Sequence, residues 1–217
     1  MKSISSVRLS QILLLIIIVL ATVSLALRFF SSSNPADTRS AVVMILDESG
    51  IIGTGTIIDA QTVLTSKHFL IEGKRYGVRF NDSSLASVVS LTLHPNLDLA
   101  LLQLDSPRHV GYPRISSQKP SLQSPVIAFG AETQDATIAE HRGVVLSQRE
   151  SLEIGGNLFT GLLLTDIPFQ SGYSGGPLMN LDGEIIWVHT AYEASGKSGW
   201  STPVTREIIS QMVNVKE

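Results

Sequence analysis

The stretch QSGYSGGPLMNLDGEII, residues 170–186, places Ser174 between Gly172 and Gly175-Gly176 and then continues into an apolar segment. A serine among glycines is usually part of a turn, because glycine adopts positive φ angles and the hydroxyl bonds to nearby backbone groups. The other interpretation is a nucleophile, which needs a histidine to take its proton and an acid to orient that histidine. The residues after Ser174 and the histidines elsewhere in the chain decide between the two.

The same stretch fits the G-x-S-x-G motif of α/β-hydrolases, in which a helix follows the serine. Here Pro177-Leu178-Met179 leads into Asp182-Gly183, and Asp-Gly between apolar runs is typical of a β-hairpin turn. The α/β-hydrolases also need their acid and histidine after the serine. The sequence therefore predicts a β-hairpin after Ser174 and argues against that class of enzyme.

A histidine and an acid in suitable settings lie upstream of the serine. His68 lies in VLTSKHFL (63–70), at the end of a strand-like run, and Asp98 lies in HPNLDLALLQL (94–104), at the start of an apolar run. His68, Asp98 and Ser174 therefore follow the chain order His, Asp, Ser. This is one of the known orders for nucleophilic catalysis by serine.

From Ser40 onward the chain consists of short strand-like runs separated by turn residues. Residues 75–80 alternate between the two faces of a strand, residues 99–104 indicate a strand buried on both faces, and 158–167 reads as one strand-like run. Proline and serine concentrate at 109–125, as in a connector between two halves. The predicted fold class is all-β with two antiparallel barrels, over about 40–108 and 122–204, and a terminal helix over 205–216.

Three separated segments together resemble one family. GTGTIIDAQTVLTSKH (53–68), NLDLALLQL (96–104) and TDIPFQSGYSGGPLMNLDGEII (165–186) look like the trypsin-like peptidases, and specifically the HtrA (Deg) branch of serine endoproteases. The likeness covers about residues 41–213. It implies a chymotrypsin-like fold of two six-stranded barrels with the active site between them. It also implies a serine-type endopeptidase that hydrolyses proteins or peptides without a cofactor.

The resemblance further implies a role for each residue of the site. His68 and Asp98 come from the first barrel and Ser174 from the second, as base, orienting acid and nucleophile. The backbone N–H groups of Gly172 and Ser174 are expected to form the oxyanion hole. The pocket for the residue before the cleaved bond is expected to be walled by Pro168, Phe169, His189, Thr190, Ala191 and Gly199 to Ser201. None of these is acidic, so a small or medium apolar guest is expected rather than Lys or Arg.

The chain departs from the family pattern at several positions. Tyr173 stands where the family usually has Asn or Asp, and Gln170-Ser171 replaces the usual Asn-Pro. About a dozen residues follow Pro203, so no PDZ domain is expected after it. Because of Tyr173, a catalytically inactive trypsin-like domain that binds peptides or partner proteins at the membrane is an alternative function. A third interpretation is an enzyme that stays latent until it assembles, since members of this branch commonly form homotrimers.

The N-terminal residues have a different character. Lys2 and Arg8 precede the apolar run ILLLIIIVLATVSLAL, 12–27. Sixteen residues at about 1.5 Å each reach roughly 24 Å, short of a hydrocarbon core of about 30 Å unless Phe29 and Phe30 extend the segment. The run length favours an uncleaved transmembrane helix at 12–30. The rival interpretation is a cleaved signal peptide, for which Ser24 and Ala26 would serve as the cleavage site.

Either interpretation exports the rest of the chain. Basic residues before the segment predict that residues 1–11 stay on the cytoplasmic side, and a linker at 31–39 then leads into a protease domain at 40–217. We expect a single-pass protein of the bacterial inner membrane with its protease domain in the periplasm. If the segment is cleaved, the domain is secreted to the periplasm.

Composition argues against several other classes. The net charge is −3 and Lys74-Arg75 is the only adjacent basic pair, so nucleic acid is not an expected partner. The chain has no cysteine, which excludes disulfides and thiolate metal sites. His94, His109 and His141 show no ligand spacing and no HExxH motif occurs, so no metal site is expected.

Overall fold

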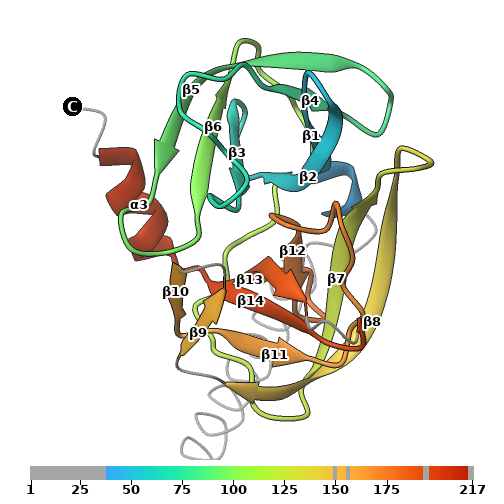
Figure 1. The fold of residues 1–217 in the computed structure, drawn as a ribbon, viewed down its shortest axis with the longest axis vertical. Coiled ribbons are helices and arrows are strands. Elements are labelled where there is room, and N and C mark those ends of the chain that lie inside the picture. Colours follow the sequence, from blue (N-terminus) through green and yellow to red (C-terminus); the bar gives the residue numbers. More distant parts are fainter. Residues whose placement is uncertain (1–37, 149–150, 155–156, 193–195, 215–217) are drawn as a thin grey trace, which may run out of the picture. The chain divides into compact units, whose positions relative to one another are not determined.

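The structure, a computed structural model, describes residues 38–148, 151–154, 157–192 and 196–214. These residues form two closed antiparallel barrels of six strands each, a separate two-stranded hairpin and one C-terminal α-helix (Figure 1). A short 3-10 turn, η1 (Arg39–Ala41), precedes the first strand. The predicted all-β class with two six-stranded barrels and a terminal helix is confirmed.

The first barrel closes in the strand order β1-β2-β3-β6-β5-β4, because β1 pairs with β2 on one side and with β4 on the other. Closure pairs every strand on both sides and leaves no free edge. Its strands are β1 (Val42–Asp47), β2 (Gly50–Ile57), β3 (Thr62–Thr65), β4 (Gly77–Arg79), β5 (Leu85–Leu93) and β6 (Ala100–Leu104).

The second barrel closes in the order β11-β14-β13-β12-β7-β8, with β11 paired to both β14 and β8. Its strands are β7 (Pro125–Glu132), β8 (Thr137–Gln148), β11 (Leu163–Thr165), β12 (Pro177–Met179), β13 (Ile185–Tyr192) and β14 (Gly199–Pro203). The remaining strands β9 (Ser151–Ile154) and β10 (Asn157–Thr160) pair only with each other. The helix α3 (Arg206–Asn214) ends the described chain.

Two turns bear on the sequence predictions. The hairpin predicted from Asp182-Gly183 forms between β12 and β13, where Gly183 has φ +73° and its N–H donates to the Asn180 carbonyl at 3.1 Å. The prediction of one strand-like run at 158–167 is wrong, because β10 and β11 are separate strands in different sheets. Gly161, with φ +68°, turns the chain between them.

The core consists of three apolar clusters: one inside each barrel and one that contains residues of both barrels. Strand β6 contributes residues to two of these clusters. Leu101 packs in the shared cluster, and Leu102 and Leu104 pack inside the first barrel. This confirms the prediction that residues 99–104 are buried on both faces. Met212 of α3 joins the shared cluster, so the helix packs where the two barrels meet.

Within the described part of the chain, no helix combines the length and the apolar character that crossing a bilayer requires. The predicted cytoplasmic segment 1–11 and the predicted anchor or signal segment 12–30 lie outside the described residues.

Candidate active site

The first barrel presents His68 and Asp98 at neighbouring strand ends. β3 and β6 pair with Thr65 opposite Ala100; His68 lies in the turn after β3 and Asp98 lies just before β6. Asp98 Oδ1 accepts the backbone N–H of His68 at 2.8 Å, and Asp98 Oδ2 lies 2.8 Å from His68 Nδ1. One carboxylate therefore fixes both the backbone and the ring of the histidine.

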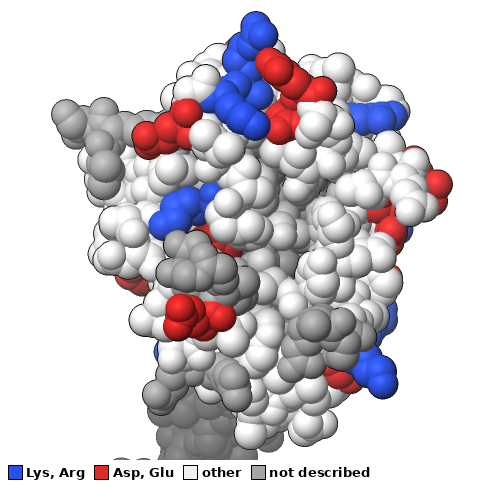
Figure 2. All heavy atoms as spheres, in the orientation of Figure 1, with Lys and Arg blue, Asp and Glu red and all other residues white. Residues whose placement is uncertain are grey.

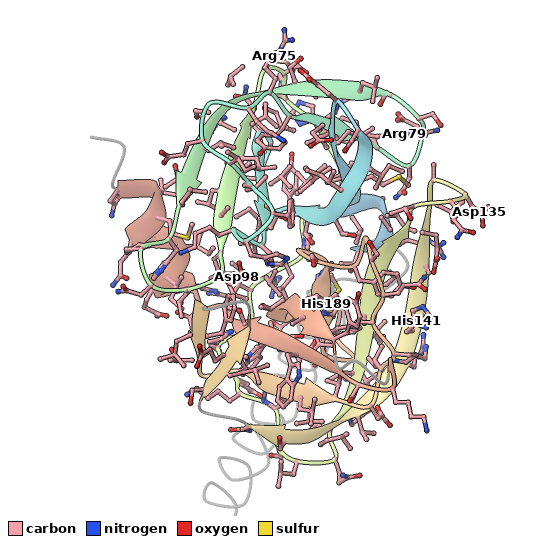
Figure 3. All side chains as sticks on the ribbon, in the orientation of Figure 1. Arg75, Arg79, Asp98, Asp135, His141 and His189 are labelled. Atoms are coloured by element: carbon pink, nitrogen blue, oxygen red, sulfur yellow. The ribbon has the colours of Figure 1, made fainter. Side chains whose placement is uncertain are left out.

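The Asp98 carboxylate determines which ring nitrogen of His68 carries the proton. The Asp98 side chain is fully buried, whereas the His68 side chain is 30% exposed. An ionised carboxylate only accepts hydrogen bonds, so Nδ1 donates and Nε2 of the neutral ring is an acceptor. His68 Nε2 lies 3.1 Å from Ser174 Oγ, within reach for proton transfer. The structure thus brings together the three residues predicted for catalysis, with Asp98 at the start of β6 (Figure 3).

Ser174 lies in a tight loop whose path requires glycine at two positions. Gly172 has φ +98° and Gly175 has φ +84°, values that L side chains rarely adopt. A Cβ on Gly172 would lie 2.5 Å from the Ala131 carbonyl oxygen, and one on Gly175 would lie 2.0 Å from Thr65 Oγ1. The glycines around Ser174 therefore allow the loop to lie directly against both barrels.

Thr54 of β2 bonds the first barrel to this loop. Its backbone N–H donates to the Ser174 carbonyl at 2.8 Å. Its hydroxyl donates to the Gly172 carbonyl at 2.6 Å and accepts the Ala131 N–H at 2.8 Å. All three bonds join residues of different barrels, so the position of the serine depends on the contact between the barrels.

The N–H groups on either side of Tyr173 remain available to a ligand. Tyr173, Gly175 and Gly176 donate to backbone carbonyls at 3.1, 2.9 and 2.9 Å. Within the described ranges, the N–H groups of Gly172 and Ser174 have no acceptor. These are the two groups that the sequence analysis expects in an oxyanion hole, and they lie on either side of Tyr173.

Tyr173 itself is buried in the core of the second barrel, with 1% of its surface exposed. Its hydroxyl donates to Glu132 Oε1 at 2.6 Å and lies 2.6 Å from His141 Nε2. Burial, followed by the hydrogen bond and the charge of Glu132, raises the pKa of the Tyr173 phenol well above its usual range. Tyr173 is therefore a neutral hydrogen-bonding side chain. Figure 3 shows His141 on β8.

The residues predicted to wall the pocket lie beside the loop. The Phe169 ring is centred 3.9 Å from the His189 ring, and its Cδ2 lies 1.9 Å from where a Cβ on Gly199 would be. His189 Nδ1 lies 3.2 Å from Ser201 Oγ. Of the other predicted wall residues, Thr190 is buried and bonds to Thr202 at 2.6 Å, Ala191 is partly exposed and Pro168 is exposed.

His189 is a fully buried histidine on β13 (Figure 3). Burial lowers the pKa of His189 to about 3, with a smaller contribution from His141. The ring is therefore neutral at physiological pH. Its Nε2 has no hydrogen-bond partner among the described residues.

Three neighbours of the nucleophile loop are missing from the sequence prediction: Thr54, Glu132 and His141. Thr54 lies in the segment GTGTII, whose glycines were a visible signal of close packing. Glu132 and His141 lie 41 and 32 residues from Tyr173, and no spacing rule connects them to it. The unusual residue at 173 was the one signal that pointed to this part of the molecule.

Charged side chains on the face in Figure 2 do not suggest a second site. Blue and red groups lie together at the top of this view, where Figure 3 labels Arg75. Arg75 lies 3.6 Å from Glu48, and Lys74 lies 3.7 Å from Asp47. Because the opposite charges are adjacent, this surface presents no field of one sign to an ionic ligand.

Comparison with known proteins identifies the family of the chain. The model of the trypsin-like peptidase domain matches residues 53–186. A probable periplasmic serine endoprotease DegP-like from Pseudomonas putida (strain W619) is 27% identical over 164 residues, which are 75% of this chain and 33% of that protein. The periplasmic pH-dependent serine endoprotease DegQ of Escherichia coli (strain K12) is 27% identical over 175 residues, 76% of this chain and 38% of DegQ. The chain thus spans roughly a third of the length of these curated relatives.

Among solved structures, the MamO protease domain from Magnetospirillum magneticum, in its apo form, superposes with a TM-score of 0.69. The match covers 81% of this chain and 97% of that domain at 24% sequence identity. At this identity the likeness supports the fold of two barrels.

Proposed function

The chain belongs to the trypsin-like peptidase domain family, and on that premise we propose that it is a serine endopeptidase with His68, Asp98 and Ser174 as its catalytic triad. The observation that carries the proposal is the hydrogen-bonded series from Asp98 through His68 to Ser174, with separations of 2.8 and 3.1 Å. The alternative, an inactive module that binds peptides, has no need of these three side chains in that arrangement. The geometry therefore favours the enzyme.

Hydrolysis proceeds in two stages. Ser174 Oγ attacks the scissile carbonyl carbon while His68 Nε2 takes the hydroxyl proton, and the imidazolium then gives that proton to the leaving amine. The acyl-enzyme that results is hydrolysed by water, which His68 deprotonates in the same way. Asp98 keeps Nδ1 protonated and stabilises the imidazolium in both stages.

The oxyanion of each tetrahedral intermediate needs preorganised donors. The N–H groups of Gly172 and Ser174 fit this role, because neither has an acceptor among the described residues. One such donor contributes about 3 kcal/mol to the stability of the transition state. Gly172 lies between Ser171 and Tyr173 with φ +98°, a backbone conformation that glycine adopts readily.

The specificity pocket favours a small or medium apolar residue before the cleaved bond. The Phe169 ring lies against both Gly199 and His189, and its bulk there favours a guest of limited size. No acidic side chain occurs among the predicted wall residues, so a buried Lys or Arg guest would stay unpaired at a cost of several kcal/mol.

The setting follows from the N-terminal sequence and from the relatives. An apolar run at 12–27 and relatives named as periplasmic both support a protease domain that acts in the periplasm, held to the inner membrane or released from it. Protein quality control or regulated proteolysis is the corresponding task. Assembly into a homotrimer through the N-terminal part of the domain belongs to the same proposal.

Labelling with a fluorophosphonate probe, together with hydrolysis of an unfolded protein substrate, tests the proposal. We expect the wild-type chain to be labelled at Ser174 and to hydrolyse the substrate, because His68 activates the hydroxyl. Ser174→Ala should take up no label and lose about 10⁶ in kcat. An unlabelled and inactive wild-type chain would instead support the binding module, and a tenth of the wild-type rate in Ser174→Ala would disprove the assignment of the nucleophile.

A further inference from the structure

Glu132 is bonded to both sides of the proposed oxyanion hole. Its Oε1 accepts the Tyr173 hydroxyl at 2.6 Å, and its Oε2 accepts the Gln170 side-chain amide. Residues 170 and 173 lie on either side of Gly172, one of the two proposed donors. A single carboxylate at the end of β7 is therefore bonded to the loop before and after the backbone N–H that must point at the oxyanion.

The protons of this cluster can be assigned from the chemistry of the three groups. A phenol has one proton, and an ionised carboxylate can only accept, so Tyr173 donates to Glu132. The hydroxyl oxygen must then accept from His141, whose Nε2 lies 2.6 Å away and carries the proton. The raised pKa of the Tyr173 phenol keeps its proton in place across the range in which proteases act. In this arrangement the Tyr173 hydroxyl donates one hydrogen bond, to Glu132, and accepts one, from His141.

The ring of Tyr173 is confined as closely as its hydroxyl. It lies flat on the backbone of β7, where a Cβ on Gly130 would come within 2.3 Å of the Tyr173 Cγ. The rings of His141 and Phe169 contact its other sides, with centroids 5.4 and 6.2 Å away. Since β7 is paired with β8 along its whole length, Glu132 and His141 are held by a continuous ladder of backbone hydrogen bonds.

The support of Tyr173 is also separate from the proposed base and acid of the triad. Glu132 lies at the end of β7 and His141 on β8, both in the second barrel, whereas His68 and Asp98 belong to the first barrel. The ion pair described in this region joins Arg142 to Glu140. Glu132 takes part in none of the described ion pairs, so its interactions are the hydrogen bonds given above. A change at Glu132 or His141 therefore reaches Ser174 only through Tyr173 and the loop.

We propose that Tyr173, Glu132 and His141 form a latch that holds the nucleophile loop in the conformation that binds the oxyanion, so that Glu132 and His141 are positioning residues for hydrolysis. The inference rests on the proposed function for its catalytic consequence. Its structural content, that the latch orders residues 170–176, is independent of any activity. The latch stabilises the transition state more than the bound substrate, because the oxyanion exists only in the former.

Steady-state kinetics of Tyr173→Phe and Glu132→Leu test the catalytic consequence. Tyr173→Phe removes the donor of the hydrogen bond between the two side chains, and Glu132→Leu removes its acceptor. We expect kcat to fall about 10- to 100-fold, the range that a hydrogen bond to a charged group accounts for, with KM changed by less than about threefold. The double variant should be no slower than the slower single variant, because both remove the same bond.

Two further variants distinguish a latch from a general loss of stability. His141→Gln keeps an N–H donor for the tyrosine hydroxyl and should retain most of kcat, whereas His141→Leu should lose it as Tyr173→Phe does. Tyr112→Phe removes another tyrosine hydroxyl, one that donates to the Arg108 carbonyl at 2.5 Å in the connector between the barrels. It should leave kcat unchanged.

Amide hydrogen exchange tests the ordering of the loop without any turnover. In a Ser174→Ala background, Tyr173→Phe should speed exchange of the bonded Gly175 and Gly176 amides at least about tenfold, while first-barrel amides keep their rates. Unchanged exchange together with unchanged kcat in an active enzyme would overturn the latch and leave the proposed function intact. If the wild-type chain proves inactive, the proposed function fails, and the exchange rates alone then decide for or against the latch.

Discussion

The two halves of the candidate active site are held in different ways. In the first barrel, Asp98 bonds both the backbone and the ring of His68, and the two residues are 30 positions apart beside the ends of paired strands. In the second barrel, the loop of Ser174 is held by Thr54, 118 positions from Gly172, and by Glu132, 41 positions from Tyr173. The first half is one local unit, and the second depends on packing between distant segments.

This difference indicates where activity is sensitive. A change in the first half acts on the chemistry of proton transfer, because the two ring nitrogens of His68 face Asp98 and Ser174. A change in the second half acts on how much of the time the loop has the correct shape. Substitutions in the two halves should therefore differ in size and in the measurements that detect them.

The largest effect is expected in the first half. Asp98→Asn places an amide N–H opposite His68 Nδ1, which favours the ring tautomer with its proton on Nε2, where it cannot accept from Ser174. We expect kcat to fall by about 10⁴, as an Asp to Asn change does in a comparable triad. Steady-state kinetics measure it, with Asp105→Asn, an exposed carboxylate bonded to Ser106, as the matched control. Equal effects of the two substitutions would contradict the role of Asp98.

A smaller effect is expected where the two halves meet. Thr54→Val keeps the size of the side chain but leaves the Gly172 carbonyl and the Ala131 N–H buried without partners, at a cost of about 1 to 3 kcal/mol each. We expect stability to fall by roughly 2 to 5 kcal/mol and kcat by at least about tenfold. Urea denaturation and kinetics measure the two quantities.

Thr54→Ser is the matched control for this change, because it retains the hydroxyl. It should stay close to the wild-type protein in kcat. If Thr54→Ser and Thr54→Val were equally impaired, the methyl group rather than the hydrogen bonds would hold the loop.

The smallest effect concerns the stability of the protein in acid. It arises in the second barrel, where His189 is buried. The pKa of His189 falls from about 6.5 in the unfolded chain to about 3 in the folded protein, so below pH 6.5 the unfolded state binds a proton that the folded state does not. Stability attributable to His189 is therefore complete above pH 6.5 and is lost as the pH falls toward 3, by up to about 1.4 kcal/mol per pH unit. At pH 4.5 the loss should be roughly 2 to 3 kcal/mol.

Urea denaturation of His189→Gln at pH 7 and pH 4.5 measures this contribution. The variant should lose less stability between the two pH values than the wild-type protein, because glutamine does not titrate. His109→Gln, at an exposed position, should behave as the wild-type protein does. A variant at position 189 with the same acid sensitivity as the wild-type protein would show that His189 is not the residue that senses acid.

The sequence predicts the first half of the site better than the second for a physical reason. Alternation and apolar runs define strands, and His68 and Asp98 lie at the ends of such runs, so their placement follows from local patterns. The hairpin after Ser174 follows from Asp182-Gly183 in the same way. The class of fold, with its two six-stranded barrels, then follows from the resemblance that these segments carry.

The partners of Tyr173 could not be predicted in this way. Glu132 and His141 reach it through the register between β7 and β8, in which Ala128 lies opposite His141. That register is set by tertiary packing and leaves no mark in the spacing of residues. The separation of β10 from β11 at Gly161 was missed for a related reason, because an apolar run by itself does not mark the point where a chain changes sheets.

The bonds that Thr54 makes across the two barrels tie the position of Ser174, the proposed nucleophile, to the contact between the barrels. Ser66 adds a further bond across it, from its hydroxyl to the His189 carbonyl at 2.6 Å. If β2 moved away from the loop of Ser174 by a fraction of a hydrogen-bond length, we expect hydrolysis to stop. The hydrophobic cores of both barrels would stay intact. On the proposed function, an inhibitor that separates the two barrels at Thr54 would therefore act without contacting His68 or Ser174.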